Sequence, residues 1–300
     1  MAAPTFAQPA TPSEPPGEAS GPAGDVLAAQ ILLDRARHSP GAIDGQMGSN
    51  TARAIRAWQR EQGLAADGRP SPALVERLRS AQSGELLQRY RITEEDVAGP
   101  FVDVPEDMSA MEGMAALAYE SPAEKLAEKF HMSQSFLISL NPGADFSRAG
   151  TEIRVANVGR DELDRVVTRI EVDKAAAALR AFNKDGKLVA TYPATVGSAV
   201  FPSPSGAMEV KAVAYEPKYY FDPANSDWGP DRKLTIAAGP NNPVGSTWID
   251  LSKDGYGIHG TPDPALIGKT ASHGCVRLTN WDAAELATAV SPSTKVEFVS

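Results

Sequence analysis

The chain has one cysteine, Cys275, among its 300 residues. A disulfide within the chain is therefore impossible, and so is a zinc module that uses several cysteines. The scarcity of cysteine leaves the cellular compartment open, because an exported protein can keep only the thiol that its chemistry requires.

Long apolar runs and clusters of Lys and Arg are also missing. No run approaches the roughly 18 residues that a membrane-spanning helix needs, so we predict no transmembrane segment. The net charge is −9 and the isoelectric point about 5.1, which argues against nucleic acid or an anionic membrane as a partner. Hydrophobic residues nevertheless make up 42% of the chain, enough for well-formed cores.

The first 24 residues lack the basic start and the apolar stretch of a signal peptide. They are rich in Pro, Ala, Ser and Gly, and we predict a disordered linker over residues 1–24. If the natural protein is exported, its signal peptide is missing from this chain.

Residues 25–82 show the apolar spacing of three short helices separated by Gly- and Pro-rich loops. Ser71 followed by Pro72 is a favourable start for the third helix, and Ser49 or Asn50 is expected to cap the second. The segment "GAIDGQMGSNTARAIRAWQREQGLAADG" resembles the peptidoglycan-binding-like helical module. We therefore predict such a domain over 25–82.

Residues 87–158 predict a second small module with the order strand, helix, helix, strand. This order, with "LNPG" after the second helix, resembles the LysM fold, which implies glycan binding. The stretch 97–120 is far longer than LysM domains usually carry there, so a spacer role is an equal alternative. His131, just before a helix cap, is expected at the surface.

From residue 163 onward the pattern turns to short strands with Gly and Pro turns. Asp185-Gly186 predicts a hairpin turn, "NWDAAELATAV" a helix, and "STKVEFV" a closing strand. We predict a multidomain α+β protein whose third domain, residues 163–299, is a β-rich sandwich or barrel-like fold with a C-terminal helix. The aromatic stretch "YEPKYYFDPANSDWG" is either a lid over the site or loop packing.

The surroundings of Cys275 suggest a nucleophile. A free thiol is mostly protonated at neutral pH and needs a neighbouring base or positive charge to react. His273 lies two residues before it and Arg277 two residues after, so all three would share one side of an extended strand. His259 lies 16 residues upstream. The peptide N–H groups near Gly274 are candidate oxyanion donors.

Two other interpretations compete. A cysteine buried in a β core is common, but such a residue rarely has His, Gly and Arg as immediate neighbours. A zinc site from His259, His273 and Cys275 is chemically allowed, although His-x-Cys is not a usual zinc spacing. The nucleophile is therefore favoured.

"GYGIHGT" followed by "SHGCVRLTN" resembles the signature of L,D-transpeptidases with a YkuD-type catalytic domain. These enzymes act on bacterial peptidoglycan. They cut the bond between the third residue of a tetrapeptide stem, at the L-centre of meso-diaminopimelate, and the terminal D-Ala. They then pass the acyl group to an amine, which gives 3→3 cross-links or attaches other amines.

The resemblance implies a role for each residue at the site. Cys275 would be the nucleophile and His259 the proton acceptor and donor, while His273 would orient the base or assist the oxyanion. Arg277 would position the loop or a substrate carboxylate. Which histidine is the base stays open. Five residues would shape the pocket: Gly260 and Thr261 beside His259, and Ser272, Gly274 and Asn280 beside Cys275.

The resemblance further implies no metal or other cofactor, peptidoglycan stem peptides and glycan as partners, acylation by carbapenems, and export to the periplasm or cell envelope. Two alternatives stay open. The same thiol could give its acyl group to water, which makes an L,D-carboxypeptidase or a cross-link hydrolase. The chain could also be a wall-binding protein without catalysis.

Overall fold

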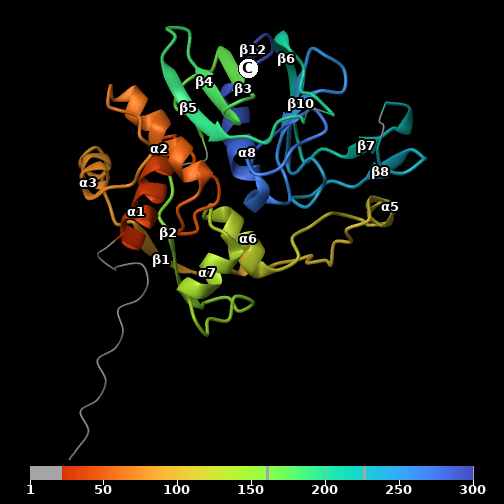
Figure 1. Ribbon diagram of the computed structural model, residues 1–300. Coiled ribbons are helices and arrows are strands. Elements are labelled where there is room, and N and C mark those ends of the chain that lie inside the picture. Colours follow the sequence, from red (N-terminus) through yellow and green to blue (C-terminus); the bar gives the residue numbers. More distant parts are fainter. Residues whose placement is uncertain (1–21, 160–161, 199, 226–227, 300) are drawn as a thin grey trace, which may run out of the picture.

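A computed structural model describes residues 22–159, 162–198, 200–225 and 228–299 (Figure 1). Most of the predicted linker, residues 1–21, lies outside these ranges, and residues 22–24 already belong to the first helix. In the part of the chain that is described, no helix has the length and apolar character needed to cross a membrane.

The N-terminal segment contains the three predicted helices: α1 (Pro22–Arg35), α2 (Ser49–Glu61) and α3 (Pro72–Ser80). The hydroxyl of Ser71 accepts a hydrogen bond from the backbone N–H of Leu74, which confirms the predicted start of α3. The prediction for α2 is wrong: Gly48 occupies the cap position, and no side chain caps the helix.

Helix α1 belongs to two hydrophobic cores at once. Leu32 and Leu33 pack with α2 and α3, whereas Leu27 and Ile31 pack into the core of the middle segment. A helix that is apolar on several sides is buried on several sides. The N-terminal and middle segments are thus joined through α1 and share its apolar surface.

The middle segment has the predicted order strand, helix, helix, strand. Its four main elements are β1 (Leu87–Arg91), α6 (Pro122–Lys129), α7 (Gln134–Leu140) and β2 (Glu152–Ala156), with the short helices α4 (Glu94–Val97) and α5 (Met108–Met111) between β1 and α6. Strands β1 and β2 pair antiparallel. Ser121 and Ser133 cap α6 and α7, as Ser-initiated helices require. The LysM resemblance itself stays a prediction.

The C-terminal segment is built on one curled sheet, in which eight strands of the described chain follow the order β11-β10-β9-β6-β12-β3-β4-β5. Its strands are β3 (Arg169–Asp173), β4 (Ala178–Phe182), β5 (Leu188–Pro193), β6 (Gly206–Tyr215), β9 (Thr247–Leu251), β10 (Gly257–His259), β11 (Val276–Arg277) and β12 (Lys295–Val299). Beyond β5 the chain turns back to β11, where Thr195 and Arg277 exchange backbone hydrogen bonds of 2.9 Å. The fold is therefore a half-barrel, and the sandwich alternative is wrong.

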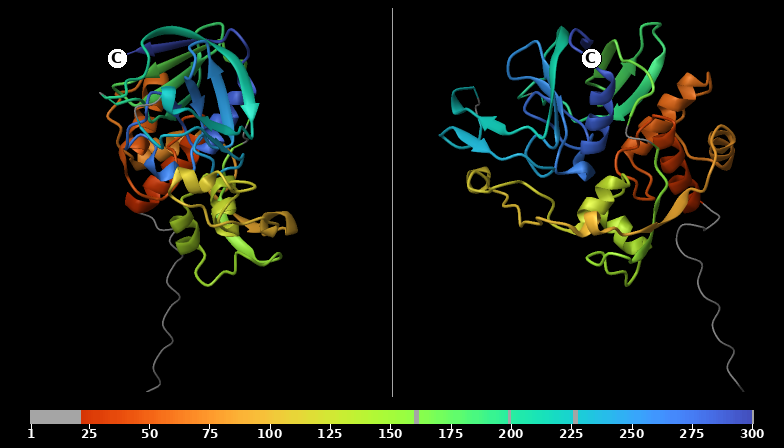
Figure 2. Two further views of the ribbon diagram at one scale, coloured as in Figure 1. Left: turned by 90° about the vertical axis from the view of Figure 1, so that its right-hand side faces the viewer. Right: turned by 180° about the vertical axis from the view of Figure 1, so that it is seen from behind.

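Helix α8 (Asn280–Ala289) lies inside the curl of this sheet (Figures 1 and 2). Leu286 is fully buried against the sheet residues Ile249, Ile258 and Val276 in the largest core of the described residues. Outside the main sheet, β7 (Tyr219–Phe221) and β8 (Leu234–Ile236) form a separate hairpin, and the 3₁₀ turns η1 (Pro223–Asn225) and η2 (Pro264–Leu266) lie in loops. The predicted C-terminal helix and the hairpin turn at Gly186 are both confirmed.

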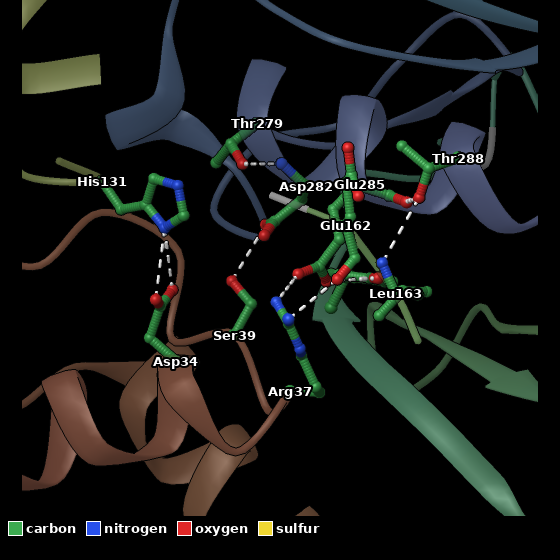
Figure 3. A network of polar contacts seen from close by, with 11 residues as sticks. Asp34, Arg37, Ser39, His131, Glu162, Leu163, Thr279, Asp282, Glu285 and Thr288 are labelled. Atoms are coloured by element: carbon green, nitrogen blue, oxygen red, sulfur yellow. Dashed lines mark hydrogen bonds and ion pairs between the residues drawn. The ribbon is translucent and has the colours of Figure 1, made fainter. Parts of the chain in front are cut away.

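His131 is buried between the three segments, so its expected surface position is wrong. Its Nδ1 lies 3.1 Å from Oδ1 of Asp34 in α1 (Figure 3). Its ring stacks on Trp281 of α8 with centroids 5.2 Å apart. Asp34 precedes His131 by 97 residues. Because Asp34 and Trp281 are both far from His131 in the sequence, local sequence patterns do not predict these contacts. Trp281 therefore packs α8 against the middle segment.

Two carboxyl groups of α8 face the junction, here meaning the region around His131 where the three segments meet (Figure 3). The hydroxyl of Ser39 donates to Asp282 at 2.9 Å, and the hydroxyl of Tyr192 donates to Glu285 at 2.7 Å. Burial, followed by the nearby charges of Asp34 and Glu285, raises the pKa of Asp282 to about 8. Burial also raises the pKa of Glu285 to about 6. The junction is thus a polar network removed from water.

Candidate active site

Cys275 and His259 come together because β10 and β11 pair in parallel. Ile258 lies opposite Val276, and His259 lies opposite Arg277. Paired residues of neighbouring strands point to the same side, so His259 and Arg277 share one side of this two-strand edge, and Cys275 immediately precedes β11. The charge of Arg277 acts on both the Cys275 thiol and the His259 imidazole, which therefore lie near the same guanidinium. Two sequence motifs 16 residues apart therefore form one site at the edge of the sheet.

The loop before Cys275 is a tight bend. Ser272 donates its hydroxyl to the carbonyl of Cys275 at 2.5 Å and accepts the N–H of Gly274 at 3.1 Å. Gly274 has φ +117°, and a Cβ there would lie 2.9 Å from the ring of Tyr256, so both conformation and space require glycine. Because Ser272 takes the N–H of Gly274, that group is not a free oxyanion donor.

The thiol of Cys275 is half-buried and held in its protonated form. It donates a hydrogen bond to the carbonyl of Gly255, with Sγ and the carbonyl oxygen 3.6 Å apart. Burial raises its pKa above the ordinary value, while a hydrogen bond from Gly257 and the charge of Arg277 act in the opposite direction. The resting site therefore contains a thiol that needs a base, and not a preformed thiolate.

His259 is a buried, neutral imidazole. Burial and then the charge of Arg277 lower its pKa to about 4. Its Nδ1 donates to the carbonyl of Gly260 at 2.7 Å, and its ring stacks on Trp248 with centroids 5.4 Å apart. The first contact fixes the tautomer, because a carbonyl accepts only from a protonated nitrogen. Nε2 is then left as the proton acceptor.

His273 lies in a different environment. It is exposed, and its ring stands between Trp228, with centroids 4.1 Å apart, and Phe201, with centroids 4.8 Å apart. Residues 273–275 form a bend before β11 begins at Val276. The sequence argument that His273 and Cys275 share one strand face is therefore wrong.

Arg277 supplies the positive charge of the site. Its charge lowers the pKa of both histidines, in each case after burial. Its side chain is half-buried, and among the residues that the structure describes no carboxylate pairs with the guanidinium. An unpaired guanidinium beside a thiol is suited to hold a carboxylate.

Asn280 acts as a clamp behind the β10 strand and does not line the wall beside Cys275. Its Oδ1 accepts the backbone N–H groups of Thr261 at 3.1 Å and Ser246 at 3.2 Å. A Cβ on Gly260 would lie 2.1 Å from that oxygen. Gly260 and Thr261 thus hold their predicted place next to His259, because the first helical residue of α8 closes against them.

Three residues outside the predicted site are its neighbours. Trp228 stacks on His273, Tyr219 is close enough to Cys275 for the charges to interact, and Glu128 accepts the Asn280 amide at 2.9 Å. Tyr219 and Trp228 belong to the aromatic stretch that was predicted to be either a lid or loop packing. Glu128 was missed, because no local sequence pattern links it to the site. Within the described ranges, no group of three or more His, Cys, Asp or Glu side chains is arranged to hold a metal ion.

Comparison with known proteins identifies the family of the chain. Residues 167–298 match the YkuD family model, described as the L,D-transpeptidase catalytic domain, and residues 22–78 match a "Putative peptidoglycan binding domain". The "Putative L,D-transpeptidase YkuD" of Bacillus licheniformis is 32% identical over 173 residues, 58% of this chain and 90% of that protein. The Bacillus subtilis protein of the same name is 30% identical over 172 residues, 57% of this chain and 89% of that protein.

The chain therefore belongs to the L,D-transpeptidase family with a YkuD catalytic domain. Among solved structures, L,D-transpeptidase 3 of Mycobacterium tuberculosis in complex with a faropenem-derived adduct aligns at 13% identity. The alignment has a TM-score of 0.38 and covers 51% of this chain and 75% of that chain.

Proposed function

We propose that the protein is a peptidoglycan L,D-transpeptidase in which Cys275 is the nucleophile. The observation that supports this proposal is the parallel pairing of β10 with β11, which puts the neutral His259 opposite Arg277, two residues after the half-buried thiol of Cys275. A neutral His259 with Nε2 unprotonated is the form that accepts a thiol proton.

The reaction divides into two acyl transfers. In the first, His259 takes the proton of Cys275, and the sulfur attacks the carbonyl carbon of the third stem residue. The C–N bond to D-Ala breaks, and the departing amine takes the proton from His259. In the second, an acceptor amine loses a proton to His259 and attacks the thioester carbon. The new C–N bond forms, the C–S bond breaks, and the sulfur of Cys275 takes the proton back from His259. The guanidinium of Arg277 holds a carboxylate of the donor stem.

The upstream segments are proposed to bind the cell wall. The match of residues 22–78 to a peptidoglycan binding domain and the LysM resemblance of residues 87–158 support this role. Together with the substrate, they support an exported protein of the periplasm or cell envelope. The thiol is also proposed to be acylated by carbapenems, because the chain belongs to the L,D-transpeptidase family and an L,D-transpeptidase has been solved in complex with imipenem.

Incubation with purified disaccharide-tetrapeptide, followed by mass spectrometry of the products, tests the reaction. We expect cross-linked dimers that have lost one D-Ala, and no product from Cys275→Ala. Disaccharide-tripeptide without dimer would instead establish a carboxypeptidase. Unchanged tetrapeptide, together with sacculus binding that survives Cys275→Ala, would establish a wall-binding protein without catalysis.

A further inference from the structure

Residues 101–120, here called the strap, leave the middle segment and run along the catalytic domain. The strap contains α5 and lies between α4 and α6. In two views it reaches the β7–β8 hairpin, far from the helices that flank it in sequence (Figures 1 and 2). It makes up most of the stretch 97–120, whose length departs from the LysM pattern.

The strap and the hairpin share a hydrophobic core. Leu117 of the strap is fully buried with Leu234 and Ile236 of β8. Partly buried strap residues complete this cluster: Val104, Met108, Met111 and Met114. Burial of this apolar surface stabilises the hairpin in one position, because the hairpin has no pairing with the main sheet of the described chain.

Polar contacts fix the same arrangement. Glu112 forms an ion pair of 2.6 Å with Arg232 and accepts the N–H of Thr235 at 3.3 Å. The N–H of Leu117 donates to Ala238 at 2.9 Å. The strap therefore contacts both β8 and the chain that follows it.

The hairpin in turn contacts the catalytic loop. Phe221 of β7 packs on Trp228 with centroids 5.2 Å apart, and Trp228 stacks on His273 at 4.1 Å. Tyr219 is partly buried, and burial followed by the charge of Cys275 raises its pKa to about 12. A continuous chain of contacts thus joins the strap to the loop that carries the thiol.

We infer that the strap positions the roof of the active site: by docking on β7–β8 it holds Tyr219 and Trp228 against the Cys275 loop, and so determines how the donor stem is bound. Met108, Met111 and Glu112 are positioning residues in this arrangement. The effect on the stem rests on the proposed function, whereas the docking itself does not.

The double variant Met108→Ser/Met111→Ser weakens the docking, and Met47→Ser, which changes a methionine that is 45% exposed, is the matched control. In protein labelled with 5-fluorotryptophan, the ¹⁹F signal of Trp228 is assigned by its loss in Trp228→Phe. We expect this signal to move toward that of free 5-fluorotryptophan in the double variant, while the other tryptophan signals and the control stay unchanged. An unmoved Trp228 signal would overturn the inference.

Steady-state kinetics with disaccharide-tetrapeptide supply the second measurement. We expect KM to rise at least about 5-fold with a smaller change in kcat, whereas general destabilisation would lower the active fraction and leave KM unchanged. Glu112→Ala, which leaves the apolar contact intact, should raise KM less than the double variant does. Glu112→Asp should restore the KM of the wild type. An unchanged KM in the double variant would overturn the inference. Absence of turnover in the wild type would refute the proposed function, and the ¹⁹F signal would still decide the docking.

Discussion

The side-chain amide of Asn280 donates to the carboxyl group of Glu128, with Nδ2 and Oε2 2.9 Å apart, across the boundary between the catalytic domain and the middle segment. The other end of the same amide holds the backbone that follows His259. One side chain therefore connects the position of the proposed base to the packing of an upstream helix.

Asn280→Ala should destabilise the fold. It leaves the buried N–H of Thr261 and the partly buried N–H of Ser246 without their acceptor, and the loss of an acceptor for a buried group costs about 1–3 kcal/mol. Asn183→Ala is the matched control, because the amide oxygen of Asn183 also accepts two backbone N–H groups, but in an exposed turn. Urea denaturation measures both free energies of unfolding. An equal loss of unfolding free energy in the two variants would contradict the role of Asn280 in holding the backbone beside His259.

Substitution of each histidine should separate the two candidate bases. His259→Gln should lower kcat by about 10²–10⁴-fold, because general base catalysis is lost. His273→Phe keeps an aromatic ring between Trp228 and Phe201 and should retain kcat within about 10-fold. Turnover of tetrapeptide measures both. A larger loss in His273→Phe than in His259→Gln would assign the base to His273.

The fold was predictable where its signals are local. The Ser-Pro start of α3 and the Asp-Gly hairpin between β4 and β5 depend on a few adjacent residues, and both are found. His273 was misplaced because a bend at Gly274 and a ring from Trp228, distant in sequence, decide its orientation. His131 was misplaced because its partners Asp34 and Trp281 come from other segments. Long-range packing of this kind leaves no local pattern.

The pH dependence of the reactivity of Cys275 should show that its thiol is protonated in the resting protein. The rate of alkylation by iodoacetamide, measured against pH, should inflect above the ordinary thiol pKa, because burial disfavours the thiolate. Arg277→Met should move the inflection to still higher pH, since the charge of Arg277 favours the thiolate. An inflection below pH 7 would instead indicate a thiolate–imidazolium pair.

Asp282→Asn should stabilise the protein increasingly as pH rises. The pKa of Asp282 is raised from 3.8 to about 8 in the folded state, so the folded protein loses stability as pH rises between these values. The amide removes this loss and can still accept the hydroxyl of Ser39. At pH 8.5 we expect a gain of about 1–4 kcal/mol, which shrinks toward pH 4.

Urea denaturation at pH 5 and pH 8.5 measures this difference. Asp185→Asn, in an exposed turn, is the control, and its effect on the free energy of unfolding is measured at the same two pH values. The junction around Asp282 also contains Asp34, His131, Glu285 and Arg37. A gain that is equal at both pH values would show that the carboxyl group of Asp282 is ionised throughout.

The central claim is that Cys275 forms a covalent acyl bond. Intact-protein mass spectrometry after incubation with a carbapenem tests it most directly, with peptide mapping to locate the adduct. We predict that the wild type gains the mass of one drug molecule on the peptide containing Cys275, that Cys275→Ala gains none, and that His259→Gln gains it more slowly. An unmodified wild type, or an adduct that persists in Cys275→Ala, would contradict the claim.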